Sequence, residues 1–136
     1  LRETVEKWPA SCGAELLLAP RATRDELLLV HTAAYVDAFA AGALSREAMQ
    51  RIGFPWSPEL VERSLRSCGG TVAATRIALQ HGAAVYLAGG THHARADRGA
   101  GYCVYNDVAV GARIVQRASA HRRVLVVDTD VHQGDG

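Results

Sequence analysis

Two short apolar runs with one helical segment between them constrain the fold of this chain most. Ala83–Leu87 and Val124–Val127 contain no charged side chain, which is typical of parallel strands that are buried on both faces. Between the runs, apolar residues recur at helical spacing after Asn106 or Asp107, either of which can cap a helix. This strand–helix–strand pattern predicts an α/β fold with a parallel sheet.

The first half of the chain is predicted to be mainly helical. Thr23 opens a Thr-x-x-Glu capping box, and Thr32 can cap a second helix. Ser57 followed by Pro58 fits the N-cap and first position of a longer helix, which we expect to end at Gly82.

Composition excludes several classes of protein. The net charge of +1 over 136 residues gives no reason to expect direct binding to nucleic acid or to an anionic membrane. No apolar stretch approaches the length of a membrane span. The three cysteines form no CxxC pair, so we expect a reducing, cytoplasmic setting. The chain starts at Leu1 and stops at Gly136, directly after its densest polar motif, so we expect residues 1–136 to be one partial domain, truncated at both ends.

Both chemically rich segments follow a predicted strand, where open parallel sheets place their active sites. After Val127 come Asp128, Asp130 and His132 at alternate positions, so an extended backbone would point all three the same way. Two carboxylates and an imidazole suit Zn, Fe(II), Co or Mn. The plainer alternative is a polar strand end that leads into a solvated turn.

The second polar segment contains adjacent histidines, His92 and His93, behind two glycines. Alone, such a pair is more typical of a surface loop. Beside an Asp-rich strand end it becomes a candidate acid/base pair, because imidazoles titrate near neutral pH. Asp128 and Asp135 are available to fix the tautomers of the two rings. Cys103 is expected to fill the core rather than act as a nucleophile.

Three linked motifs stand at Gly89–Ala94, Gly101–Asp107 and Val126–Gly136. In order and spacing they resemble the histone deacetylase superfamily. This superfamily includes bacterial acetylpolyamine and acetoin-utilisation amidohydrolases, and the Gln after His132 is most similar to bacterial members resembling class IV deacetylases. The resemblance implies a three-layer arginase/deacetylase-type α/β fold with a parallel sheet, of which only the first half is present.

The resemblance also implies a metal site. Asp130 and His132 would be zinc ligands, and a potassium ion would bind nearby, near Asp128 and Asp130. In the family, the third zinc ligand, an Asp, and a Tyr that polarises the substrate carbonyl lie downstream of the last motif, so we expect this piece alone to be inactive.

The family pattern assigns the remaining site residues as well. His93 would act as general base and then acid, with His92 as its electrostatic partner; Asp128 would pair with His92 and Asp135 with His93. Gly101 and Tyr102 would line the narrow substrate tunnel. Tyr102 stands where the family usually has Phe, and Asp135 is often Asn in class IV-like members. The loop Ile52–Pro55 lacks the Asp with which class I enzymes grip a peptide.

The implied reaction is hydrolysis of an N-acetyl amide, in an acetyl-lysine protein or an acetylated small molecule such as a polyamine, by metal-activated water. A haloacid-dehalogenase-type phosphatase would also place Asp-x-Asp after a strand, but would leave His92 and His93 unexplained. Two alternatives stay open, namely an arginase-type binuclear manganese hydrolase and a deacetylase-like binding module without turnover.

Overall fold

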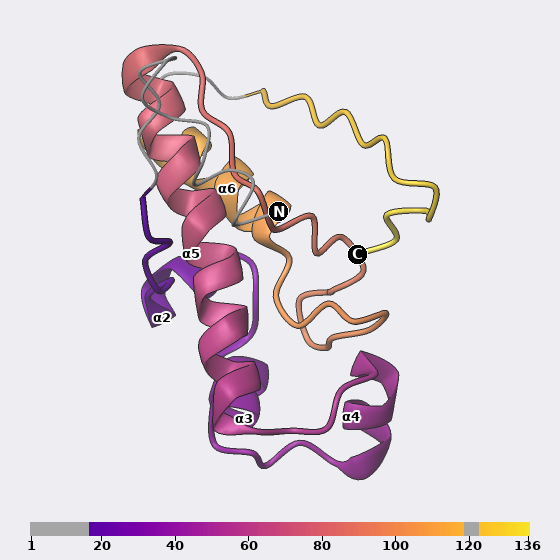
Figure 1. The fold of residues 1–136 in the computed structure, drawn as a ribbon. Helices are drawn as coiled ribbons and strands as arrows, with labels where there is room; N and C mark the ends of the chain where they lie inside the picture. The colour runs from indigo at the N-terminus through magenta and orange to yellow at the C-terminus, as the bar shows by residue number, and fades with distance from the viewer. Residues whose placement is uncertain (1–16, 119–122) are drawn as a thin grey trace, which may run out of the picture.

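The computed structural model describes residues 17–118 and 123–136, and within these ranges the regular structure is helical (Figure 1). The helices are α2 (Arg24–Leu27), α3 (Ala33–Ala40), α4 (Arg46–Ile52), α5 (Pro58–His81) and α6 (Asp107–Ala118). The long α5 packs along α6, and the loops between α5 and α6 lie beside this pair. None of the helices in the described ranges is both long and apolar enough to cross a membrane.

The helix starts follow the capping residues of the sequence. Thr23 forms the predicted capping box, and the Thr32 hydroxyl accepts a hydrogen bond from the first turn of α3. Ser57 caps α5 with Pro58 in its first turn, and Gly82 ends it with φ 91°. The helix α4 was not predicted, although Ser45 caps it in the same way.

Two adjacent glycines inside α5, Gly69 and Gly70, allow close contacts instead of breaking the helix. A Cβ on Gly69 would collide with the Pro20 carbonyl, and one on Gly70 would collide with the ring of Tyr86. One segment before α5 and one after it in the sequence therefore approach its backbone closely. These contacts offset the lower helix propensity of glycine.

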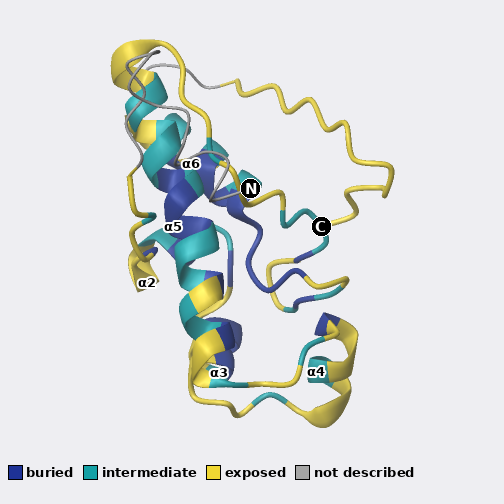
Figure 2. Ribbon diagram, viewed as in Figure 1, coloured by how far each residue is buried: buried dark blue, intermediate teal, exposed yellow. Residues whose placement is uncertain are grey.

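The core lies where the helices meet the loop that leads into α6 (Figure 2). Phe39 is fully buried and contacts Tyr105 edge-on, with ring centroids 5.7 Å apart. Tyr35 donates a 2.8 Å hydrogen bond to the carbonyl of Val104. Because only Asn106 separates Val104 and Tyr105 from α6, this packing fixes the segment between Gly101 and the start of that helix.

The predicted parallel sheet is not confirmed. In the described ranges, Ala83–Leu87 and Val124–Val127 have no strand partner, and β-pairing is limited to the isolated bridges Arg95↔Arg98 and Ala100↔Cys103. Residues 123–136 form an extended arc that leaves the helices and returns at the C-terminus (Figure 1). A strand is stabilised through hydrogen bonds to neighbouring strands, and no described segment supplies them here. Leu125 is consequently 86% exposed.

Candidate active site

The His92–His93 loop and the end of the 123–136 arc meet through the backbone. Gly136 N–H donates a 2.9 Å hydrogen bond to the carbonyl of His92. The amide of Asn106, one residue before α6, donates to the carbonyl of Ala94 at 3.0 Å, and its oxygen caps α6 by accepting from Ala109 N–H. The start of α6 and the C-terminal residues therefore hold the histidine loop from two sides.

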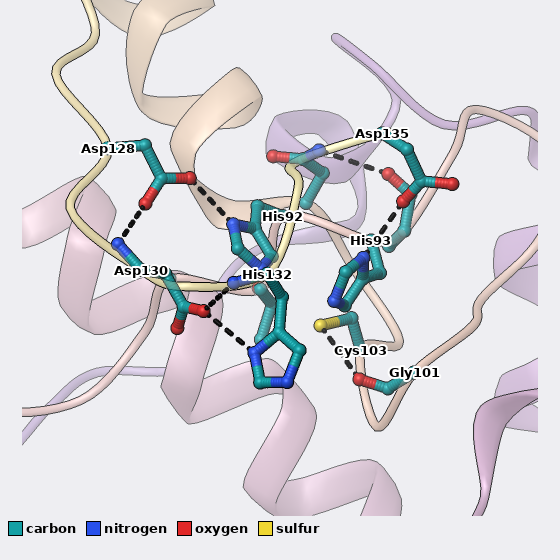
Figure 3. Close-up of polar contacts among 12 residues, drawn as sticks. His92, His93, Gly101, Cys103, Asp128, Asp130, His132 and Asp135 are labelled. Atoms are coloured by element: carbon teal, nitrogen blue, oxygen red, sulfur yellow. Dashed lines mark hydrogen bonds and ion pairs between the residues drawn. The ribbon is translucent and has the colours of Figure 1, made fainter.

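His92 faces Asp128 across this junction (Figure 3). Its Nδ1 lies 2.6 Å from Oδ2 of Asp128, whose other oxygen accepts a 2.9 Å hydrogen bond from the N–H of Asp130. The hydrogen bond with Asp128 raises the pKa of His92, and the same contact lowers the pKa of Asp128. Asp128 thus orients the His92 ring and favours its protonated form.

His93 faces a second carboxylate, that of Asp135. The Nδ1 to Oδ1 distance is 2.8 Å, and Arg95 reaches the other oxygen at 3.0 Å. The hydrogen bonds from His93 and then Arg95 lower the pKa of Asp135 to about 2. Asp135 therefore stays charged next to His93 throughout the neutral range. Sequence reasoning missed Arg95, although it stands only two residues after His93.

The imidazoles of the site lie close together. The centroids of His92 and His93 are 4.4 Å apart with the rings tilted by 61°, and the centroids of His93 and His132 are 6.2 Å apart. The structure thus brings the two histidine–aspartate pairs, whose members come from separate motifs, next to His132, one of the two expected metal ligands.

Asp130 and His132 face each other rather than the other side chains of the cluster (Figure 3). Oδ1 of Asp130 accepts from the backbone N–H of His132 at 2.7 Å and lies 2.8 Å from its Nδ1. The backbone hydrogen bond from His132 is the main reason that the pKa of Asp130 is lowered. Asp128 turns instead towards His92, so the three alternate side chains do not converge on one point as the extended pattern suggested.

The donor set fits two positions of a zinc site. An anionic oxygen and an imidazole nitrogen are typical zinc ligands, and two such donors on a tetrahedral ion stand about 3.3 Å apart. Widening the present 2.8 Å contact by about half an ångström would admit the ion between them. Within residues 17–118 and 123–136, no third acidic, histidine or cysteine side chain joins them in a metal-binding group.

Gly101 and Tyr102 form a strained turn next to His93. Gly101 has φ 53°, and a Cβ there would come within 2.7 Å of the His93 ring. Tyr102 has φ 64°, the one positive value of a non-glycine residue in the described ranges. Its N–H and that of Gly101 donate to carbonyls of the last turn of α4, those of Ile52 and Arg51. These bonds satisfy helix-end carbonyls and fix the turn.

Tyr102 is largely exposed. It contacts Phe54 edge-on at 5.1 Å between ring centroids and covers Gly53. The next residue, Cys103, is buried, and burial raises the pKa of its thiol. A raised pKa disfavours the thiolate, in keeping with the expectation that Cys103 fills the core.

Comparison with known proteins identifies relatives along almost the whole chain. The model of the histone deacetylase domain matches residues 2–136. An uncharacterized protein of Picosynechococcus sp. is 48% identical over 110 residues, which cover 81% of this chain and 37% of that protein. The acetoin utilization protein AcuC of Staphylococcus aureus is 33% identical over 133 residues, covering 90% of this chain and 34% of its own length. AcuC of Bacillus subtilis is 37% identical over 131 residues, covering 88% and 34%. The chain therefore spans roughly a third of the length of these relatives.

Proposed function

The chain belongs to the histone deacetylase family, and from this premise we propose that the full-length protein is a zinc-dependent deacetylase that hydrolyses an N-acetyl amide. The observation that carries the proposal is the pairing of His92 with Asp128 and of His93 with Asp135, with the two rings 4.4 Å apart. A surface loop without a catalytic role has no need for two oriented imidazoles, each held by its own carboxylate.

We assign different roles to the two histidines from their surroundings. His93 takes the proton of the attacking water and later gives a proton to the leaving amine, which is general acid/base work typically worth ~10²–10⁴-fold in rate. Asp135 keeps the His93 ring in one tautomer, and Arg95 keeps Asp135 in place. His92, whose pKa is raised by Asp128, stabilises the negative charge that develops beside it.

Asp130 and His132 are the residues that would hold zinc, because their donor atoms already lie side by side. Bound zinc supplies Lewis acidity to the acetyl carbonyl and to the attacking water. For potassium near Asp128 and Asp130, the support is the family resemblance. Both oxygens of Asp128 already accept hydrogen bonds, so such an ion would need backbone carbonyls as its main ligands.

We also propose a cytoplasmic location for the protein.

For the substrate we propose an acetylated amine, either an acetyl-lysine side chain or an acetylated small molecule. The support for the substrate is the turn of Gly101 and Tyr102, which lies so close to His93 that a Cβ on Gly101 would come within 2.7 Å of the ring. A thin alkyl chain such as a lysine stem or a polyamine suits such a restricted approach.

The test uses the full-length protein with zinc, assayed on an acetyl-lysine peptide and on an acetylated polyamine. We expect turnover of at least one, abolished by a chelator and restored by zinc. Asp130→Ala should lose metal and activity together, whereas His93→Ala should keep the metal and lose turnover. A zinc-loaded protein that hydrolyses neither substrate would refute the proposal and favour a binding module, and restoration by manganese alone would favour the arginase-type alternative.

A further inference from the structure

A buried carboxylate that belongs to neither histidine–aspartate pair lies at the start of α6. Asp107 is only 1% exposed, and its two oxygens lie within hydrogen-bonding distance of four donors. The donors are Gly90 N at 3.1 Å, Thr91 N at 2.7 Å, Thr91 Oγ1 at 2.6 Å and Thr71 Oγ1 at 2.5 Å. A buried carboxylate is tolerated only when its oxygens are satisfied in this way.

Three of these four donors belong to the two residues directly before His92. Thr91 also accepts from the backbone N–H of Asp107, at 3.3 Å, so the two residues bind each other in both directions. Gly89 completes the contact, because a Cβ there would collide with the Asp107 carboxylate. The backbone from Gly89 to Thr91, which leads into the histidine pair, therefore packs closely against the Asp107 side chain.

The fourth donor connects the same carboxylate to the most extensively packed part of the molecule. Thr71 lies in α5, Asp107 is the first residue of α6, and these two helices pack along each other. A negative charge at the first position of α6 is also favoured by the helix dipole. Asp107 thus ties a loop without regular secondary structure to a rigid helix pair.

We propose that Asp107 is a positioning residue for His92 and His93, an inference that rests on the proposed function. Asp107 contacts neither ring; it fixes Gly90 and Thr91, and through them the starting point of the histidine segment. Misplacement of a catalytic group by about 1 Å can cost ~10²-fold in rate. Loss of this anchor should therefore reduce kcat by about 10- to 100-fold and leave KM and zinc content nearly unchanged.

The test compares isosteric variants of the full-length, zinc-loaded protein. Asp107→Asn keeps the shape but turns an N–H group towards donors on one side. Thr91→Val removes the loop hydroxyl, which contacts both Asp107 and the carbonyl of Tyr105, and is the milder variant if Asp107→Asn folds poorly. Thr71→Val is the matched control for the loss of one hydrogen bond to the same carboxylate, because it leaves the three bonds to Gly90 and Thr91 in place. Val110→Ala, a fully buried position one turn along α6, controls for general loss of stability.

We expect Asp107→Asn and Thr91→Val to lower kcat well beyond either control at equal stability. The ¹⁵N chemical shifts of the His92 and His93 rings should change, and the amide protons of Gly90 and Thr91 should exchange faster. Unchanged ring shifts and amide exchange, or a kcat loss no larger than that of Val110→Ala, would overturn the positioning role. The shift and exchange measurements need no turnover, so an inactive wild type would refute the proposed function while these readouts still decide the role of Asp107.

Discussion

His31 is a buried residue whose replacement should lower the free energy of unfolding through the loss of two hydrogen bonds. It lies between α2 and α3 and is 3% exposed. Its Nε2 accepts a 3.0 Å hydrogen bond from the backbone N–H of Asn106, so its Nδ1 must carry the proton and donate to the carbonyl of Arg95 at 2.9 Å. One neutral imidazole thereby links the N-terminal helices to the loop that leads into α6.

The cost of His31→Ala follows from the two groups that lose their partner. Asn106 is buried, so its unpaired N–H should cost ~1–3 kcal/mol, whereas the carbonyl of the exposed Arg95 can turn to water and should cost ~0.5–1.5 kcal/mol. The ring also packs against Tyr105, at 5.4 Å between centroids. We expect a loss of about 2–5 kcal/mol in the free energy of unfolding, a large part of the 5–15 kcal/mol typical of a native protein.

The same contacts predict acid sensitivity. Burial lowers the pKa of His31, so the unfolded chain takes up a proton at a pH where the folded protein does not. The contribution of the neutral ring is therefore fully present above the unfolded pKa of about 6.5, and it is lost as the pH falls from there towards the folded value. A proton on Nε2 would face the Asn106 N–H directly.

Urea unfolding of the full-length protein between pH 5 and pH 8 measures both effects. His31→Gln can keep an acceptor for Asn106, and His31→Asn a donor for Arg95, but neither titrates. Below pH 6.5, the free energy of unfolding of both variants should therefore fall less than that of wild type. At pH 8, His31→Gln should be more stable than His31→Asn. A free energy of unfolding for His31→Ala within 0.5 kcal/mol of wild type, or equal acid sensitivity in all variants, would show that His31 does not stabilise the fold in this way.

Three further predictions concern the site. Gly101→Ala should lower kcat strongly and the melting temperature only slightly, because the new methyl group meets the His93 ring and φ is 53° at this position. Measurement of kcat and melting temperature side by side checks this, and an unchanged kcat would contradict it. Asp135→Asn should lower kcat at constant zinc content, since it removes the charge that faces His93 and Arg95; steady-state kinetics beside metal analysis is the test. Residues 1–136 expressed alone with zinc should show no deacetylation, because catalytic zinc sites generally use three protein ligands and the family pattern assigns two here; chelator-sensitive turnover near the full-length rate would show that the site is complete.

Local signals in the sequence predicted local structure well. Thr23, Thr32 and Ser57 cap helices as expected because a capping side chain bonds to backbone only two or three positions away. The sheet was a non-local prediction. An apolar run such as Val124–Val127 has the composition of a buried strand, but a strand also needs neighbouring strands to pair with, and the run itself gives no information about them.

In the candidate site, too, local motifs could be recognised from the sequence, whereas contacts between distant residues could not. The histidine and aspartate residues could be listed from their motifs, and their pairing followed from the family resemblance. Arg95 and Asp107 were not assigned roles in the site, because their importance there depends on contacts with Asp135 and Thr91, 40 and 16 positions away. Contacts of this kind depend on the fold and leave no periodic pattern in one sequence.

The position of the bound metal would decide whether Asp130 and His132 are zinc ligands. Crystals of the full-length protein grown with zinc, measured at the zinc absorption edge, should give an anomalous peak about 2.0–2.2 Å from a carboxylate oxygen of Asp130 and an imidazole nitrogen of His132. The direct 2.8 Å contact between these two side chains should then have opened around the ion. An active enzyme whose metal lies elsewhere, with Asp130 and His132 still bonded to each other, would show that these two residues are not its metal ligands.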